Sequence, residues 1–185
     1  MSETEGPIRE NIVLVGFMGS GKSAIGRSIA KRLGFLFLDS DQIVIDRAGG
    51  RPIAQIFEEE GEEAFRNYET LALESLRHRE RCVIATGGGA VLREGNRVLL
   101  RELGLVVCLT ASEDAIFERV SRTSKRPLLR TANPRETLHL LLEARQPAYQ
   151  AAAQITLDTT ELTQPQAAEV IIAEARRAFL WDRAA

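Results

Sequence analysis

The sequence predicts a three-layer α/β/α protein, in which helices cover both faces of a parallel sheet. Short apolar runs, typical of buried strands, alternate along the chain with stretches of helical spacing. A glycine-rich turn links the first apolar run to the first helical stretch. Polar or glycine residues follow the first three runs, at the edge where open α/β sheets bind their ligands. The five strand-like runs are residues 12–15, 35–38, 82–85, 105–109 and 155–157.

Local signals mark where the helices begin and end. Apolar residues at helical spacing predict a helix over residues 24–33, and Gly34 ends it. Ser112 precedes two acidic residues and Asn133 precedes a proline, so both are expected N-caps. Further helices are expected over about residues 62–77 and after Pro165.

The composition favours one domain over residues 1–185. With 27% charged residues and a net charge of −2, the chain is not expected to be disordered or to bind nucleic acid or membranes. No apolar run approaches the ~20 residues of a membrane span. Residues 1–11 are polar and acidic, which predicts a flexible tail rather than a signal or transit peptide. The two cysteines fall in predicted buried strands, where packing explains them, and a monomer in a reducing cytoplasm is expected.

Residues 16–23 read Gly-Phe-Met-Gly-Ser-Gly-Lys-Ser and fit the phosphate-binding pattern G-x-x-x-x-G-K-[ST]. With a strand before it and a helix after it, such a loop binds phosphates through backbone N–H groups and the helix N-terminus. Lys22 is expected to reach the β- and γ-phosphates, and the Ser23 hydroxyl to bind Mg²⁺. A chance glycine-rich turn is the alternative, which the flanking elements disfavour. The residues expected to bind ATP here are Gly19, Ser20, Gly21, Lys22, Ser23 and Ala24.

Asp39 and Asp41 follow the second apolar run. An extended strand end would place both carboxylates on similar sides, close to the metal. One could hold Mg²⁺ through water, and the other could accept a proton from an attacking hydroxyl. Two aspartates at a helix N-terminus, favoured by the helix dipole alone, are the alternative. The neighbouring phosphate loop favours the functional interpretation.

Gly87, Gly88 and Gly89 follow the third run. Three successive glycines cost backbone entropy unless another group must approach the backbone closely. A phosphate or a polar substrate would explain them, and a tight turn is the alternative.

Arg66 and Glu69 lie three residues apart on the helix expected over residues 62–77. Taken alone, they predict an i,i+3 surface salt bridge worth roughly a few tenths of a kcal/mol. Phe57 and Phe65 are likewise expected in the core rather than at a ligand.

Residues 122–134 are basic, bounded by prolines and without a periodic apolar face, which predicts a mobile loop. A nucleic-acid-binding patch is the alternative, but the segment lacks interleaved aromatic residues. Beside a nucleotide site, a basic loop is better explained as a lid that brings an arginine to the transferring phosphate and excludes water. Arg145 is expected to close the helix after the lid, where a cation at a helix C-terminus is the alternative explanation.

Together these segments resemble the shikimate kinases over about residues 12–179. The resemblance depends on an ordered set of motifs: the phosphate loop, Leu-Asp-Ser-Asp, Phe-Arg-x-x-Glu, Gly-Gly-Gly-Ala, Arg-Pro-Leu-Leu and Arg-x-Pro-x-Tyr. It implies a P-loop kinase fold with a five-stranded parallel sheet in the order 2-3-1-4-5, a lid at about residues 122–134 and a substrate-binding region at about residues 41–78. The implied reaction is in-line transfer of the ATP γ-phosphate to the 3-hydroxyl of shikimate, in the biosynthesis of chorismate and aromatic amino acids.

The resemblance also implies catalytic, nucleotide and metal roles. Lys22, Asp41 and Arg126 would be catalytic, with Arg126 as the lid arginine on the phosphates. Arg119 would stack on adenine, next to the loop at residues 158–165. Ser23 would bind Mg²⁺ directly, and Asp39 would bind it through water.

The implied shikimate contacts come from three segments of the chain. Arg66 and Arg145 suit a carboxylate ligand, because a planar guanidinium group can donate two parallel hydrogen bonds to a carboxylate. Glu69 would orient Arg66, which revises the surface salt bridge expected from the pair alone. The contacts are Asp41, Arg66, Glu69, Gly87, Gly88, Gly89 and Arg145.

Three alternative functions fit fewer motifs. Gluconate kinase, or another small-metabolite P-loop kinase, shares the loop, but Arg66, Glu69 and Arg145 favour shikimate. A GTPase-like switch would need Asp-Arg-Ala-Gly at residues 46–49 to follow a strand, whereas they lie in a helical segment, and the chain has no Asn-Lys-x-Asp motif. An inactive ATP-binding module is disfavoured because every catalytic position is filled.

Overall fold

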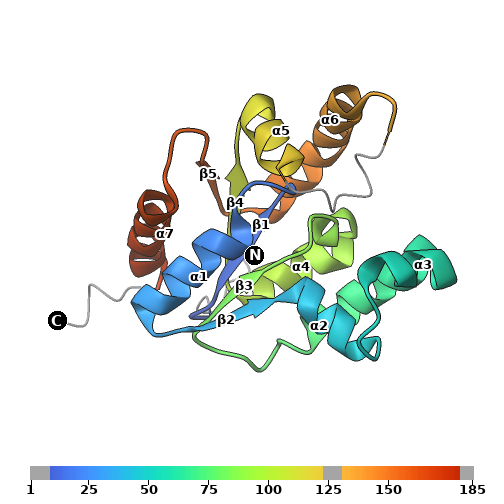
Figure 1. The fold of residues 1–185 in the computed structure, drawn as a ribbon. Helices are drawn as coiled ribbons and strands as arrows, with labels where there is room; N and C mark the ends of the chain where they lie inside the picture. Colours follow the sequence, from blue (N-terminus) through green and yellow to red (C-terminus); the bar gives the residue numbers. More distant parts are fainter. Residues whose placement is uncertain (1–8, 123–130, 180–185) are drawn as a thin grey trace, which may run out of the picture.

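The structure is a computed structural model that describes residues 9–122 and 131–179. At its centre lies a five-stranded parallel sheet in the order β2-β3-β1-β4-β5 (Figure 1). The predicted α/β class and strand order are therefore confirmed. The strands are β1 (Ile12–Gly16), β2 (Leu36–Asp39), β3 (Cys82–Ala85), β4 (Leu105–Thr110) and β5 (Ile155–Asp158).

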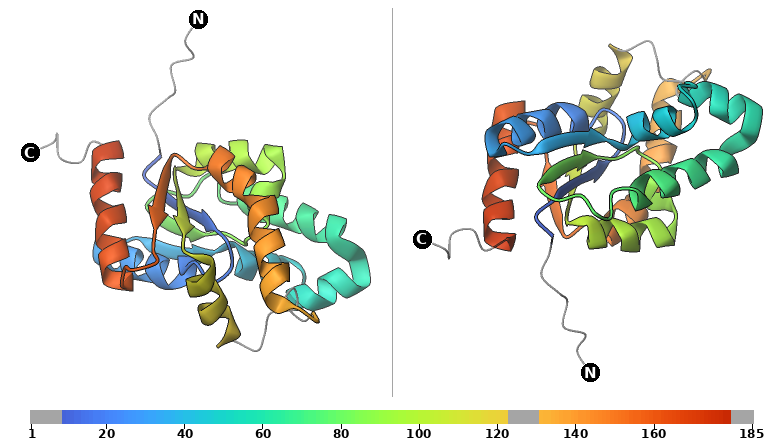
Figure 2. Two further views of the ribbon diagram at one scale, coloured as in Figure 1. Left: turned by 90° about the horizontal axis from the view of Figure 1, so that it is seen from above. Right: turned by 90° about the horizontal axis from the view of Figure 1, so that it is seen from below.

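Helices cover both faces of this sheet. Figure 2 shows α1 and α7 on one face and α4 and α6 on the other, while α3 lies on the opposite side of the molecule from α7. The helices are α1 (Lys22–Leu33), α2 (Ser40–Arg47), α3 (Ile53–Glu74), α4 (Glu94–Leu103), α5 (Glu113–Ser121), α6 (Pro134–Ala152) and α7 (Gln164–Ala178), with a short 3₁₀ turn, η1 (Ala90–Leu92), after β3.

The central strand β1 divides the core into two apolar layers. Ile12 and Leu14 are fully buried in the layer formed with α1 and α7. Val13 and Val15 face the layer formed with α4, α5 and α6. A strand that is apolar on both faces belongs in the middle of a parallel sheet, which explains why the first run contains no polar residue.

The helix boundaries follow the expected local signals. Gly34 ends α1 with a φ of 66°, in the left-handed region that glycine adopts without a Cβ penalty. The Ser112 hydroxyl accepts a hydrogen bond from the N–H of Ala115 at the start of α5. Asn133 caps α6 in the same way, and Pro134 takes the first helical position.

Three expectations about helices are corrected. The helix expected over residues 62–77 runs from Ile53 to Glu74, with a break at Gly61, whose φ of 82° and ψ of 176° are not helical. Asp41 lies in the first turn of α2 rather than on an extended strand end, because α2 begins at Ser40. Arg145 does not close α6, since the helix continues past Pro147 to Ala152.

Within residues 9–122 and 131–179, no helix is both long and apolar enough to cross a bilayer.

Candidate active site

The phosphate loop joins β1 to α1, as the motif predicted. Gly19 and Gly21 have φ values of 80° and 93°, which residues other than glycine rarely adopt. Lys22 lies at the start of α1, and its Nζ donates hydrogen bonds to the carbonyl oxygens of Gly16 at 2.7 Å and Phe17 at 2.9 Å. A loop that ends in the N-terminus of a 12-residue helix is a site for phosphate groups.

Ser23 and Asp39 meet beside this loop. The Ser23 hydroxyl donates a hydrogen bond of 3.1 Å to Asp39 Oδ2. The other oxygen, Asp39 Oδ1, accepts from the N–H of Asp41 at 3.1 Å and so caps α2. A hydroxyl and a carboxylate suit Mg²⁺, which takes few protein ligands and keeps several waters.

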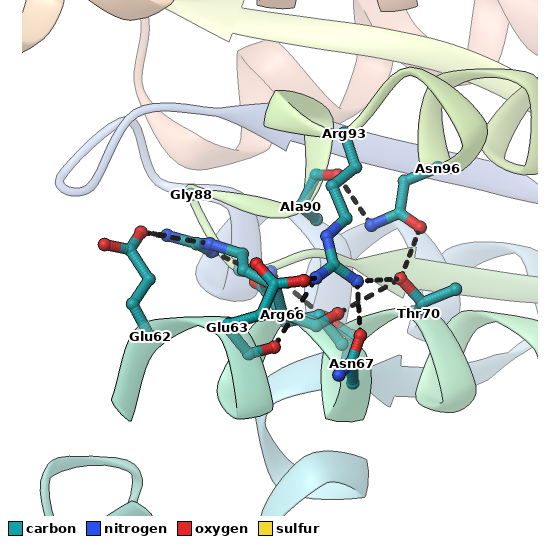
Figure 3. Close-up of polar contacts among 12 residues, drawn as sticks. Glu62, Glu63, Arg66, Asn67, Thr70, Gly88, Ala90, Arg93 and Asn96 are labelled. Carbon is teal, nitrogen blue, oxygen red and sulfur yellow. Dashed lines mark hydrogen bonds and ion pairs between the residues drawn. The ribbon is translucent and has the colours of Figure 1, made fainter. Parts of the chain in front are cut away.

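Arg66 and Glu69 form a buried ion pair on α3. Relative exposures of 9% for Arg66 and 2% for Glu69 show that the surface location expected from the pair alone is wrong. Glu62 Oε1 accepts from Arg66 Nη2 at 2.9 Å on the exposed side, as Figure 3 shows. The guanidinium is therefore held between two carboxylates in a fixed orientation.

Burial gives Glu69 an unusual electrostatic environment. Burial raises the pKa of the Glu69 carboxyl, Arg66 lowers it, and the nearby Asp41 raises it further, so that the net shift is upward. Glu69 Oε1 is buried without a hydrogen-bond partner among the described residues. A buried polar atom that lacks a partner is costly, which favours an interaction with a ligand hydroxyl.

The three glycines lie where other groups approach the backbone. A Cβ at Gly87 would overlap Asp41 Oδ1 and lie 2.9 Å from Glu69 Oε1, and one at Gly89 would overlap the Arg66 guanidinium. A Cβ at Gly88 would lie 3.7 Å from the Gly16 carbonyl oxygen in the phosphate loop. The turn thus touches the carboxylates, the arginine and the phosphate loop at once.

Arg145 approaches the same region from α6. Its guanidinium carbon lies 5.8 Å from the centre of the Phe17 ring in the phosphate loop. Its charge lowers the pKa of Glu69, which places the two side chains within electrostatic range. Neighbouring elements thus bring together Asp41, Arg66, Glu69, residues 87–89 and Arg145.

Comparison with known proteins identifies the family to which this arrangement belongs. A family model described as shikimate kinase matches residues 18–176. The chain belongs to the shikimate kinase family. The shikimate kinase of Thermodesulfovibrio yellowstonii is 46% identical over 168 residues, which cover 91% of this chain and 96% of that protein. The shikimate kinase of Geobacter sulfurreducens is 50% identical over 149 residues, or 80% and 81% of the two chains.

Solved structures of shikimate kinases share the fold. The shikimate kinase of Acinetobacter baumannii in complex with shikimate is 40% identical, with a TM-score of 0.84 over 90% of this chain and 92% of that one. The shikimate kinase of Aquifex aeolicus is 31% identical, with a TM-score of 0.75 over 92% and 98%. The chain accordingly has the activity of this family, the ATP-dependent phosphorylation of shikimate.

Gluconate kinase, the alternative enzyme, is a more distant structural neighbour of this chain. The gluconokinase of Sinorhizobium meliloti is 21% identical, with a TM-score of 0.58 over 97% of this chain and 100% of that one. At 21% identity, the similarity shows only that the two proteins share a fold.

The structure describes the surroundings of one of the two arginines predicted to bind the nucleotide. Arg119 lies beside the loop after β5, where its Nη2 donates to the Thr159 carbonyl oxygen at 2.9 Å. Arg119 thus lies next to the loop at residues 158–165, and its contact with adenine stays a prediction. Arg126 and most of the predicted lid lie outside the described residues.

Sequence reasoning missed the side chains that hold the glycine turn. The Ser40 hydroxyl accepts from the N–H of Gly87 at 3.0 Å, and the Tyr149 hydroxyl donates to the Gly88 carbonyl oxygen at 2.6 Å. Asn96, which is buried, donates to the Ala90 carbonyl oxygen at 3.0 Å, as Figure 3 shows. Tyr149 is the last residue of the Arg-x-Pro-x-Tyr motif, so that motif was the available signal.

Proposed function

We propose that this chain transfers the γ-phosphate of ATP in line to the 3-hydroxyl of shikimate, in the biosynthesis of aromatic amino acids. The residue assignments depend on the position of the glycine turn. Gly88 lies against Gly16 of the phosphate loop, and Gly87 lies against Asp41. A substrate bound at this turn would have a hydroxyl next to the phosphate loop. Such proximity is the main requirement for phosphoryl transfer.

ATP would bind along the loop, with Gly19, Ser20, Gly21 and Ala24 around its phosphates. Lys22 would stabilise the charge on the transferring phosphoryl group. Arg119 would lie at the adenine, beside Thr159. Arg126, in the predicted lid at about residues 122–134, would add a second charge at the phosphates.

Mg²⁺ would be held by Ser23 directly and by Asp39 through water, and the meeting of these two oxygens supports this assignment. The residues 9–122 and 131–179 contain no cluster of three or more His, Cys, Asp or Glu side chains able to hold a metal. A Mg²⁺ ion that completes its shell with nucleotide phosphates and water needs no such cluster. When bound, the ion would neutralise phosphate charge and orient the β- and γ-phosphates.

Shikimate would bind in the region at about residues 41–78 together with the glycine turn and α6. Arg66 and Arg145 would bind its carboxylate, which a guanidinium can hold through two hydrogen bonds. Asp41 would accept hydrogen bonds from ring hydroxyls and take the proton of the attacking one. Glu69 would orient Arg66 and offer its unpartnered oxygen to the substrate.

Measurement of ADP release tests the proposal. With ATP and Mg²⁺, release should require shikimate and should be negligible with water or gluconate as the acceptor. Phosphorus–proton correlation NMR of the product should place the phosphate on the 3-hydroxyl. Turnover of gluconate without turnover of shikimate would overturn the proposal. A monomeric state, a single domain and a cytoplasmic location remain predictions from the sequence.

A further inference from the structure

The glycine turn at residues 87–89 and the adjoining Ala90 are held by side chains from three different helices. Ser40 comes from α2, Tyr149 from α6 and Asn96 from α4. Consecutive glycines have wide conformational freedom, so their own torsional preferences do not define one shape for the turn. Contacts from outside the turn must fix where its N–H and C=O groups point.

Tyr149 differs from the other two because it lies on α6, the helix that also carries Arg145. Its hydroxyl donates to the Gly88 carbonyl oxygen at 2.6 Å. The charge of the Arg145 guanidinium, one turn earlier on α6, lies close enough to lower the pKa of Tyr149. The hydroxyl therefore holds the turn proposed to contact the substrate ring and lies near an arginine proposed to hold the substrate carboxylate.

The Tyr149 side chain is buried in the core, and the residue borders a cavity. The cavity, of about 480 Å³, is also lined by Phe17, Cys108, Leu142 and Gln146. The packed ring holds the hydroxyl in place, and the hydroxyl in turn holds the Gly88 carbonyl oxygen.

The protonation state of Tyr149 suits a permanent donor. Burial raises the pKa of Tyr149 to about 12, although the Arg145 charge lowers it. The hydroxyl therefore keeps its proton throughout the pH range in which such enzymes work.

We infer that Tyr149 is a positioning residue for the acceptor substrate: through its hydroxyl it sets the place of Gly88 relative to Arg145, and thereby the geometry of the shikimate site. The inference rests on the proposed role of the glycine turn and Arg145 in substrate binding. It assigns to Tyr149 no contact with ATP.

Tyr149→Phe removes the hydroxyl and keeps the ring. The Michaelis constant for shikimate should rise about five- to tenfold, the change expected for one lost hydrogen bond. The Michaelis constant for ATP should change by less than about twofold, because the phosphate loop keeps its own contacts. Equal increases for both substrates, or an unchanged constant for shikimate, would overturn the inference.

The chain offers a matched control, because it has only two tyrosines. The Tyr68 hydroxyl lies on α3 near Arg51 Nη2 at 3.3 Å and Glu60 Oε2 at 3.4 Å, away from the glycine turn. Although Tyr68 falls within residues 41–78, its hydroxyl bonds to Arg51 and Glu60 and to none of the proposed substrate contacts, so Tyr68→Phe should change each Michaelis constant by less than about twofold.

The Tyr68→Phe background also allows a test that leaves Tyr149 intact. Biosynthetic 3-fluorotyrosine then gives a single fluorine resonance, from residue 149. Saturating shikimate alone should shift this resonance, and no shift would count against the inference even if Tyr149→Phe fails to fold.

Arg66→Ala, measured in parallel, distinguishes failure of the inference about Tyr149 from failure of the proposed substrate site. If Arg66→Ala weakens shikimate binding and Tyr149→Phe does not, only the inference about Tyr149 fails. If neither variant affects shikimate binding, the proposed substrate site itself is wrong.

Discussion

The guanidinium of Arg66 occupies the space into which a Cβ at Gly89 would project. Gly89 has a φ of −101° and a ψ of −6°, a conformation open to any residue. Glycine is therefore required at this position by the closeness of Arg66 and not by backbone torsion. Arg66 in turn cannot retreat easily, because Glu69 and Glu62 hold it from both sides.

Gly89→Ala should displace Arg66 and damage the substrate site. We expect a loss of about 1–3 kcal/mol in the free energy of unfolding, typical of overpacking, and an increase of more than about tenfold in the Michaelis constant for shikimate. Gly95→Ala is the control, since Gly95 lies in α4 with no atom within 4 Å of its added Cβ. That variant should be as active as the wild type and up to about 1 kcal/mol more stable.

Lys22→Ala should lower kcat by about 100- to 1,000-fold, the range observed when one charge-stabilising group is removed. Thermal unfolding should change little, because Lys22 is only half-buried and bonds to carbonyl oxygens of its own loop. Steady-state kinetics with a Tm measurement checks this. Near-normal kcat in a folded variant would rule out the proposed role of the loop lysine.

Arg66→Ala should weaken shikimate binding by about 2–4 kcal/mol, because it removes one partner of a hydrogen-bonded carboxylate. The matched variant Glu62→Gln removes only the exposed partner of Arg66 and should cost at most about 1 kcal/mol. Titration calorimetry with shikimate measures both. Equal effects of the two variants would mean that Arg66 does not contact the substrate.

Asp41→Asn should lower kcat far more than it changes the affinity for ATP. The carboxylate loses its capacity to accept a proton, while the phosphate loop and the Ser23–Asp39 pair remain. Single-turnover kinetics combined with nucleotide binding separates the two effects. A proportionate loss of ATP binding would reassign Asp41 to the metal.

His139 should titrate at a higher pH than an isolated histidine. A hydrogen bond that the imidazole donates to the Glu113 carboxylate, together with the charge of Glu143, raises its pKa above 6.5. A histidine whose pKa is raised on folding stabilises the protein fully below the unfolded value of 6.5, and this contribution is lost as the pH rises through the folded value. NMR titration should show the raised value, and Glu113→Gln should lower it. An unaltered titration in that variant would contradict the assignment.

The fold followed from the sequence because its signals were local. The all-apolar run before the phosphate loop and the caps Ser112 and Asn133 act within a few residues, so their spacing indicates structure directly. The break at Gly61 was missed, since an isolated glycine inside a helical pattern does not reveal its torsion angles.

The site was harder to predict because its contacts are long-range. Burial of Arg66 and Glu69 depends on the packing of α3 near the glycine turn, and the spacing of three residues fits a surface pair equally well. The Tyr149–Gly88 bond joins residues 61 positions apart in the sequence, and no periodicity signals such a contact.

The glycine turn at residues 87–89 has a consequence for inhibition. Its polar groups are backbone N–H and C=O groups, which every point substitution except one to proline leaves in place. Substitution at Gly87 or Gly89 would also drive a side chain into Asp41 or Arg66. An inhibitor that takes its hydrogen bonds from this turn would therefore face a surface with few routes to resistance, because the changes that repel the inhibitor would also disable the enzyme.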